Sequence, residues 1–320
     1  MAGVRLGIGD DAAVLERGAF DLVALDTMVE GVHFRWGWSS AADVGWKLLA
    51  RNLSDIAAMG GTSGPFLLSF ALGEGVDGAC VDGLVEGLEA AARAMVEARG
   101  EVGPIGGDTT RSPGPTVLSL TLFGRTGPRG PVTRRGAQAG DVVAVVGALG
   151  AAAAGLEVLQ RGLEGVGRWA ELVEAHRRPW AQVRAGAWLG RQEGVRAMID
   201  VSDGFAQDLG HLLRPAGLGA RVEFEALPSP AALRACAVEL GAEGSRWVLA
   251  GGDDYALVVI AAAGRFEAIA AAAAGEGIEL VSVGRVRSER GVEVVGAGGL
   301  QIAASLAGYE HTFEGGGEEG

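Results

Sequence analysis

The sequence predicts a mixed α/β (α+β) protein of two domains, and three observations support this fold class. A chain of 320 residues, 48% of them hydrophobic, is long enough for two domains with cores of their own. In both halves, short apolar segments typical of strands alternate with longer segments typical of helices. Between residues 125 and 140 the composition changes to Gly, Pro and Arg, which predicts a boundary between domains 1–130 and 131–310. Residues 311–320 are predicted to form a disordered tail.

The first half begins with the segment LGIGDDAAVL, which is expected to form a strand that leads into an acidic turn. Residues 21–26 are expected to form a strand that ends at Asp26, and a loop rich in aromatic residues follows from 27 to 38. Ser40 and Asp43 have the spacing of a capping box, which predicts a helix that runs to about Met59. The apolar residues of that helix form one expected buried stripe: Val44, Leu48, Ile56 and Met59. The other elements expected in this half are a strand, a helix and a strand: 65–72, 77–99 and 116–124.

The second half is organised around residues 198–213, MIDVSDGFAQDLGHLL, which predict a strand, a turn and the start of a helix. Ser202 and Asp203 are the candidate N-cap residues, because their side chains can accept N–H groups of a first helical turn. The Gly-rich segment 143–155 lacks the GxGxxG spacing of a nicotinamide site. The other elements expected in this half are strands at 141–146 and 255–261 and a helix at 151–160.

The charge and composition exclude several classes of function. A formal net charge of −13 argues against a nucleic-acid binder, which would present a basic face. Lys47 is the only lysine and follows Trp46, so the chain has no Walker A loop. Two cysteines are too few for a disulfide framework or a zinc site, and they fit a reducing cytoplasm. No apolar run reaches the roughly 20 residues that span a membrane, and no signal pattern is present.

Acidic turns recur along the chain. The turn from Asp200 to Gly204 holds two carboxylates, and three others place acidic residues after glycine: Gly9-Asp10-Asp11, Gly106-Gly107-Asp108 and Gly251-Gly252-Asp253-Asp254. One Gly-Asp pair is ordinary turn composition, but the repetition favours a shared function. Proteins usually hold Mg²⁺ with carboxylates and substrate phosphates. We therefore expect these turns to converge on Mg²⁺ beside a nucleotide triphosphate.

Individual residues have simpler interpretations as well. Lys47, Arg51 and Asp55 follow one another at i,i+4 spacing, which is typical of a surface ion-pair ladder. His33 lies in a loop, where a structural histidine is more common than a catalytic one. Arg134 lies in the boundary segment, where arginines are usually exposed, although an arginine there can also bind a phosphate.

Seven stretches carry a resemblance to a known family. They are GIGDDAAVL, LDTMVEGVHF, NLSDIAAMGG, IGGDTTRSPG, VTRRGAQAGD, IDVSDGFAQDLGHL and GGDDYAL. In this order they resemble the bacterial thiamine-monophosphate kinases, of the aminoimidazole ribonucleotide synthetase-like superfamily. The GDD and GGDTT turns recur across that superfamily, whereas VEGVHF, NLSDIAAMG and DVSDG are more specific to the kinases.

The resemblance implies a fold, an activity and partners. The first domain is expected to pair its strands with those of a second subunit in a shared barrel, so that the protein is a homodimer. The implied activity is ATP-dependent phosphorylation of thiamine monophosphate to thiamine diphosphate, by direct in-line transfer with more than one Mg²⁺. No general base is expected, because the acceptor phosphate is already anionic near neutral pH.

The resemblance also implies the site residues. Six aspartates match metal ligands: Asp11, Asp26, Asp55, Asp108, Asp200 and Asp203. Nucleotide contacts are expected at Gly107, Asp108, Arg134 and Ser202, and substrate contacts at His33 and Asp253. Asp55 and Asp203 are expected to assist the transfer through bound metal. The chain departs from the family pattern at four positions: Ala24, Leu25, Asp253 and Leu306.

Two alternatives remain open from the sequence. The first is another ATP-using member of the superfamily. A hydrogenase-maturation protein would need a C-terminal cysteine, and a selenophosphate synthetase would need a reactive cysteine or selenocysteine near its N-terminus. The second alternative is a non-catalytic protein that binds a nucleotide or divalent ions.

Overall fold

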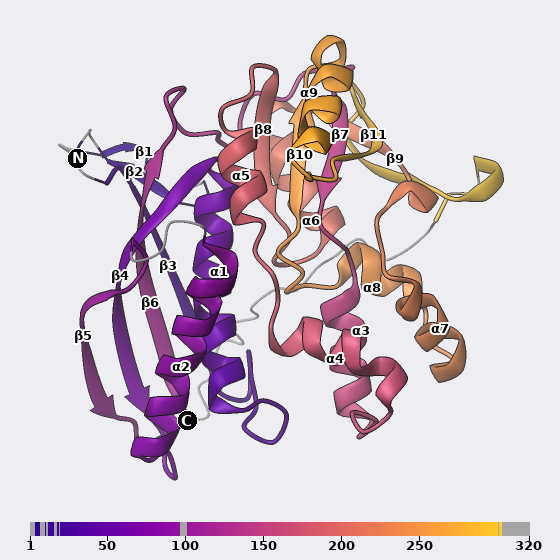
Figure 1. Ribbon diagram of the computed structural model, residues 1–320. Helices are drawn as coiled ribbons and strands as arrows, with labels where there is room; N and C mark the ends of the chain where they lie inside the picture. The colour runs from indigo at the N-terminus through magenta and orange to yellow at the C-terminus, as the bar shows by residue number, and fades with distance from the viewer. Residues whose placement is uncertain are drawn as a thin grey trace, which may run out of the picture.

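Two six-stranded sheets, one from each half of the chain, organise the computed structural model (Figure 1). The structure describes residues 4–6, 10, 12–15, 18, 20–96, 101–299 and 301–302. The expected two-domain mixed α/β fold is confirmed. No described helix is long and apolar enough to cross a bilayer.

The first sheet has the strand order β1-β2-β3-β6-β4-β5. Its strands are β1 (Val4–Leu6), β2 (Ala13–Leu15), β3 (Leu22–Val29), β4 (Gly61–Leu72), β5 (Pro104–Arg111) and β6 (Val117–Thr126). β4 and β5 are parallel, and the other pairs are antiparallel. Helices α1 (Ala41–Ala58) and α2 (Gly78–Met95) pack on one face of this sheet, against inward residues such as Leu118, Leu120 and Leu122 of β6.

Helix α1 follows the sequence closely. Ser40 and Asp43 form the predicted reciprocal capping box, with the Asp43 amide 3.2 Å from Ser40 Oγ and the Ser40 amide 2.9 Å from Asp43 Oδ2. All four residues of the expected apolar stripe are buried: Val44, Leu48, Ile56 and Met59. α2 crosses α1 closely, because Gly87 has no Cβ; an added Cβ there would lie 2.0 Å from the Ala42 carbonyl oxygen.

The second sheet has the order β12-β9-β11-β7-β10-β8. Its strands are β7 (Val142–Val146), β8 (Val195–Asp200), β9 (Gly219–Glu223), β10 (Leu257–Ala261), β11 (Val281–Arg287) and β12 (Gly291–Val295). β7 and β10 are entirely buried, because helices cover both faces of the sheet. The helices of this half are α3 (Ala151–Gln160), α4 (Ala170–Arg177), α5 (Val183–Leu189), α6 (Phe205–Leu213), α7 (Ala231–Leu240), α8 (Gly244–Ala250) and α9 (Ala263–Gly275), with short 3-10 turns η1 (Gly167–Trp169), η2 (Arg214–Ala216), η3 (Phe224–Ala226) and η4 (Ala297–Gly299).

The structure corrects several expected boundaries. β3 continues to Val29, so Asp26 lies within the strand opposite Leu120 and does not end it. Residues 106–108 were expected as an acidic turn, but they lie within strand β5, because β4 supplies a parallel partner for the glycine-rich segment. The described residues form open sheets and no closed barrel, because β5 has no second neighbour within one chain.

Candidate functional site

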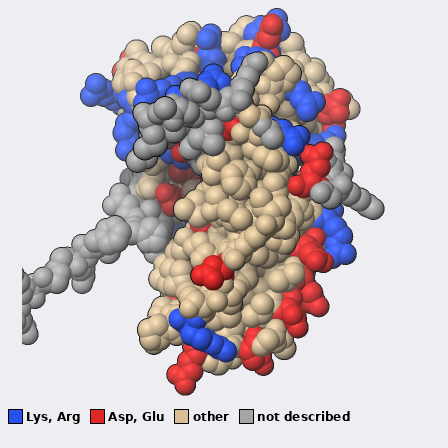
Figure 2. All heavy atoms as spheres, turned by 90° about the vertical axis from the view of Figure 1, so that its left-hand side faces the viewer, with Lys and Arg blue, Asp and Glu red and all other residues tan. Residues whose placement is uncertain are grey.

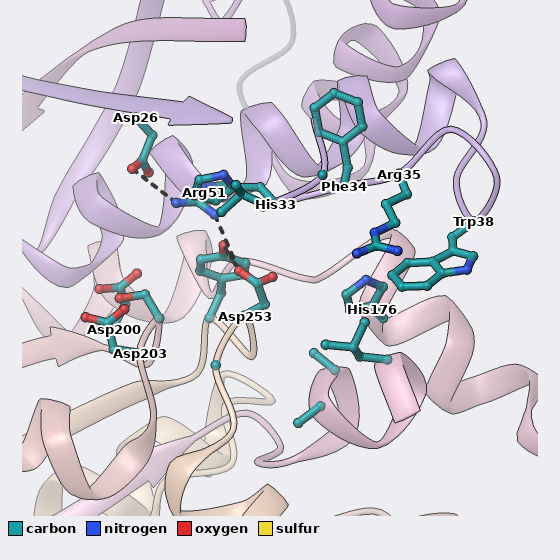
Figure 3. A pocket seen from close by; sticks show the side chains of 18 of the residues that line it. Asp26, His33, Phe34, Arg35, Trp38, Arg51, His176, Asp200, Asp203 and Asp253 are labelled. Atoms are coloured by element: carbon teal, nitrogen blue, oxygen red, sulfur yellow. Dashed lines mark hydrogen bonds and ion pairs between the residues drawn. The ribbon is translucent and has the colours of Figure 1, made fainter. Parts of the chain in front are cut away.

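A pocket of about 640 Å³ lies where the two sheets and their helices meet (Figure 3). Strand β3, helix α1 and the loop between them supply one side: Asp26, Gly31, Val32, His33, Phe34, Arg35, Trp38, Arg51 and Asp55. The second half of the chain supplies the other side: Ala152, Ala153, Leu156, Gln160, His176, Asp200, Ser202, Asp203, Gly252, Asp253 and Tyr255. The pocket therefore joins an acidic end to an aromatic and apolar end.

The acidic end brings together side chains from five segments of the chain. Asp26 comes from β3, Asp55 from α1 and Asp253 from the loop before β10, while Asp200 ends β8 and Asp203 follows it in the turn before α6. Asp200 and Asp203 lie side by side in the close view (Figure 3). Five predicted carboxylates thus share one pocket.

Asp208 holds the turn that presents Asp203. Its Oδ2 accepts the backbone N–H groups of Ser202, Asp203 and Gly204, each at 3.1 Å. Burial raises the pKa of Asp208 to about 7, and the negative charge of Asp203 adds to this, against the opposing effect of the three N–H donors. Ser202 and Asp203 are not N-caps, contrary to the sequence prediction. Gly204 takes that position with φ +133° and no side-chain cap, because Asp208 reaches back to the free amides.

The loop before β10 is fixed from both domains. Asp254 accepts the amides of Gly150 at 2.6 Å and Ala152 at 3.2 Å, and so caps α3 from a distance. Burial raises the pKa of Asp254 to about 7 against those hydrogen bonds. Its neighbour Asp253 has a left-handed backbone with φ +64°.

Asp253 is the centre of a partly buried ion network. Lys47 Nζ lies 2.7 Å from Asp253 Oδ2, and the Tyr255 hydroxyl donates to Asp253 Oδ1 at 2.6 Å. Arg51 lies between Asp253 and Asp26, 3.5 Å from an oxygen of each (Figure 3). Burial acts to raise the pKa of Asp253, but Lys47 and then Arg51 outweigh it and hold the pKa well below the usual range.

The surface ladder considered for α1 is therefore wrong. Lys47 is only 3% exposed, because α1 packs between the two halves of the chain. Lys47 and Arg51 project towards the loop before β10, and Asp55 lines the same pocket.

The opposite end of the pocket is built from rings and apolar groups. His33 Nδ1 accepts the Val29 amide at 3.1 Å, so that a neutral His33 carries its proton on Nε2. The Arg35 guanidinium lies 4.7 Å from the centre of the Trp38 ring. Burial, and then the charge of Lys47, lowers the pKa of His176 to about 3, so His176 is neutral at physiological pH.

The remaining predicted residues lie outside this pocket. Gly107 and Asp108 are exposed on edge strand β5. The ladder Asp26–Leu120–Leu68–Gly107 places Gly107 three strands away from Asp26. Adjacent strands are about 4.8 Å apart, so one chain does not bring Asp108 to Asp26. The Arg134 amide donates to Asp10 Oδ1 at 2.5 Å. Asp11 and Leu306 lie outside the described residues.

Sequence reasoning missed several residues of the site. Asp208 and Asp254 hold its loops, Tyr255 and Lys47 fix Asp253, and His176 lines the aromatic end. Asp208 follows the acidic turn at a spacing that lets its carboxylate return to the start of α6, which is a local signal. His176 has no such signal, because its place depends on how α4 packs against α1.

The donor set fits Mg²⁺ when substrate phosphates complete it. Among the residues that the structure describes, no three His, Cys, Asp or Glu side chains are grouped as a metal cage. Mg²⁺ usually takes only one or two carboxylates from the protein and fills its shell with water and phosphate oxygens. The adjacent Asp200 and Asp203 match that partial set (Figure 3).

The fold and the pocket define a class of protein. The family model for the N-terminal domain of AIR synthase related proteins matches residues 9–126, and the model for their C-terminal domain matches residues 138–297. The thiamine-monophosphate kinase of Mycobacterium tuberculosis (strain CDC 1551 / Oshkosh) is 40% identical over 261 residues, 80% of this chain and 75% of its own length. The thiamine-monophosphate kinase of Salmonella typhimurium is 34% identical over 314 residues, 96% of this chain and 92% of its own.

Solved structures agree with these relatives. A structure described as AaThiL complexed with AMPPCP and TMP superposes with a TM-score of 0.82 and 29% identity, and the match covers 95% of this chain and 92% of that one. The chain belongs to the thiamine-monophosphate kinase family.

Proposed function

We propose that this protein transfers the terminal phosphoryl group of ATP to the phosphate of thiamine monophosphate and releases thiamine diphosphate. The observation that carries the proposal is one pocket with five aspartates at one end and aromatic groups at the other. The family assignment supports it, as does the related structure with AMPPCP and TMP bound. The absence of a membrane-spanning helix among the described residues is compatible with a cytoplasmic enzyme.

The acidic end serves the reacting phosphates in this proposal. Asp26, Asp55, Asp200 and Asp203 would hold more than one Mg²⁺, together with phosphate oxygens. Bound Mg²⁺ supplies charge screening between two anionic substrates. Asp208 keeps the turn of Asp203 rigid, so the carboxylate meets its ligand without a cost of ordering. The acceptor oxygen is already anionic, so direct in-line transfer proceeds without a general base or a phosphorylated residue.

The aromatic end serves the thiamine part of the acceptor. Its thiazolium ring carries a positive charge, and an indole face attracts such a cation. The Trp38 ring lies at this end and already attracts the Arg35 guanidinium, 4.7 Å from its centre, and His33 Nε2–H offers a hydrogen-bond donor at the same end. Asp253 is held in place by Lys47 and Tyr255 at the junction of the two ends.

A second copy of the chain completes the nucleotide site in this proposal. The outer face of the first sheet carries exposed Leu25 and Leu67, Ile105 is exposed on edge strand β5, and Figure 2 shows a largely uncharged central surface on that side of the molecule. β5 adds an edge with Gly107 and Asp108. Pairing of two such faces would form the shared barrel and bring Gly107 and Asp108 to the partner's phosphates, with Arg134 as a further nucleotide contact.

Product analysis tests the activity. Purified protein is incubated with ATP, Mg²⁺ and thiamine monophosphate, and thiamine diphosphate is measured by chromatography as its fluorescent oxidation product. We expect one ADP for each thiamine diphosphate and no phosphoprotein after a rapid quench with labelled ATP. A different product from ATP would indicate another superfamily activity, and tight ATP binding without any product would indicate a non-catalytic protein.

A further inference from the structure

We infer that Arg51 binds the phosphate of the acceptor, as a fixed cation of the protein among the carboxylates of the acidic end. The inference rests on the proposed function and adds a residue to the substrate contacts expected from the sequence. Arg51 lines the pocket with its side chain 14% exposed. It lies at the junction of the acidic and aromatic ends, whereas Arg35 lies beside Trp38 (Figure 3).

The contacts of Arg51 leave its hydrogen-bonding capacity largely uncommitted. Its Nη1 is 3.5 Å from Asp253 Oδ1, and its Nη2 is 3.5 Å from Asp26 Oδ1. A committed guanidinium–carboxylate hydrogen bond measures about 2.7–2.9 Å, so neither contact has the geometry of a strong pair. The buried Nε has no hydrogen-bond partner. The Arg51 guanidinium thus lies between two carboxylates without a strong hydrogen bond to either.

Asp253 does not need Arg51 as its counter-ion. Lys47 already lies 2.7 Å from Asp253 Oδ2, and Tyr255 donates to Oδ1 at 2.6 Å. A positive charge beside Asp26 would also oppose a cation on that carboxylate, unless an anion lies near both. A phosphate in the pocket meets this condition and gives the guanidinium a bidentate partner.

The position of Arg51 favours the acceptor phosphate over the donor. Arg51 shares one pocket with His33 and Trp38, which we assign to the thiamine part. Of the expected nucleotide contacts, Gly107 and Asp108 lie outside the pocket on edge strand β5, and Ser202 lines the pocket from the side of the second sheet. An arginine between the rings and the carboxylates therefore contacts the phosphate that is linked to those rings.

Binding to two matched ligands tests the inference. Dissociation constants for thiamine monophosphate and for thiamine, which lacks the phosphate, are measured by calorimetry without nucleotide, for the wild type, Arg51→Gln and Arg51→Lys. We expect Arg51→Gln to weaken thiamine monophosphate about 10- to 100-fold, the range of a charge-assisted hydrogen bond, and to leave thiamine unchanged. Arg51→Lys keeps the charge but not the bidentate guanidinium, so its affinity for thiamine monophosphate should lie between those of the wild type and Arg51→Gln.

Controls separate the outcomes. Arg93→Gln removes a cation that is 71% exposed on α2 and should change neither ligand. AMPPCP affinity should stay unchanged in Arg51→Gln; selective loss of AMPPCP would assign Arg51 to the donor and overturn the inference. An equal loss of affinity for thiamine and for thiamine monophosphate would mean that Arg51 only links the two domains and does not contact the phosphate. Failure of the wild type to bind thiamine monophosphate at all would refute the proposed function itself.

Discussion

Asp203 and Asp208 have different tasks in the same turn. Asp208 is buried and accepts three backbone N–H groups, whereas Asp203 lines the pocket beside Asp200. One residue therefore shapes the turn and the other presents its carboxylate to the ligand. Substitutions at the two positions should differ in what they damage.

Asp203→Asn should lower kcat about 100-fold or more, because a neutral amide is a poor partner for a divalent cation. The melting temperature should stay within about 2 °C, since the turn is held by Asp208 and not by Asp203. Steady-state kinetics and a thermal melt measure both quantities. Asp82→Asn, on the exposed side of α2, is the control. A near-normal rate in Asp203→Asn would remove Asp203 from the site.

Asp208→Ala should instead destabilise the fold. It leaves three N–H groups without their acceptor, one buried and two half-buried, and each unsatisfied buried group costs about 1–3 kcal/mol before water compensates. We expect a net loss of about 2–4 kcal/mol in the free energy of unfolding, measured with urea. Asp208→Asn keeps one acceptor oxygen and should lose less. Equal losses for the two variants would contradict this role of the carboxylate oxygen.

His176 predicts a pH dependence of stability. Its pKa is lowered from 6.5 to about 3 by burial and then by Lys47, so the unfolded chain binds the proton first as the pH falls. The contribution of neutral His176 to the free energy of unfolding is present above pH 6.5 and declines as the pH falls below it. Between pH 7.5 and 5.0 this one group should cost about 2 kcal/mol. Urea unfolding of the wild type and His176→Gln at both pH values measures the difference; parallel losses in the two proteins would contradict it.

Helices α1 and α2 are held at a short distance by glycine. A Cβ at Gly87 would lie 2.0 Å from the Ala42 carbonyl oxygen, closer than any real contact. Gly87→Ala should therefore push the helices apart and cost about 1–3 kcal/mol or more, as overpacking does. Gly78→Ala in the same helix meets no atom within 4 Å and should be neutral or slightly stabilising. Thermal melts of the two variants compare them directly, and equal melting temperatures would refute the close-contact argument.

Local signals predicted the elements that depend on local chemistry. The capping box at Ser40 placed the start of α1, and the expected helix at 151–160 coincides with α3. β5 was missed because Gly106 and Gly107 suggest a turn, while their strand conformation comes from pairing with β4. Asp253, the shared partner of Lys47 and Arg51, was missed for the same reason: it lies 202 residues from Arg51 in sequence, and i,i+4 spacing does not reveal it.

The residues that line the site were predicted better than the ends of the strands and helices that carry them. Seven expected residues share one pocket because each lies in or next to a strand or helix at the junction of the two halves: His33, Asp26, Asp55, Asp200, Ser202, Asp203 and Asp253. The residues that shape those loops, such as Asp254, carry no separate signal, since their hydrogen bonds reach other elements. Asp108 stays a prediction that depends on a second chain.

The whole molecule should be a homodimer in solution. Leu25 is 64% exposed on the outer side of the first sheet and Ile105 is 65% exposed on its edge strand β5, which are unusual places for large apolar groups. Light scattering after gel filtration should give twice the chain mass of 32.5 kDa. Leu25→Arg should shift the measured mass to that of the monomer. It should also lower activity, because Asp108 then no longer reaches the nucleotide site of a second chain. Val238→Arg, at an 85% exposed residue of α7, should do neither. A fully active monomeric wild type would refute the shared site.

Lys47 has a consequence for how this chain can be divided. Its ammonium group is buried in the first half of the protein, and Asp253 in the second half supplies the neighbouring negative charge. Cutting the chain between the two halves and separating the fragments would break this ion pair and uncover the surface by which α1 packs between the halves. Gene fission or exchange of a single half with a distant relative is therefore disfavoured, and the two halves are expected to evolve as one inherited unit.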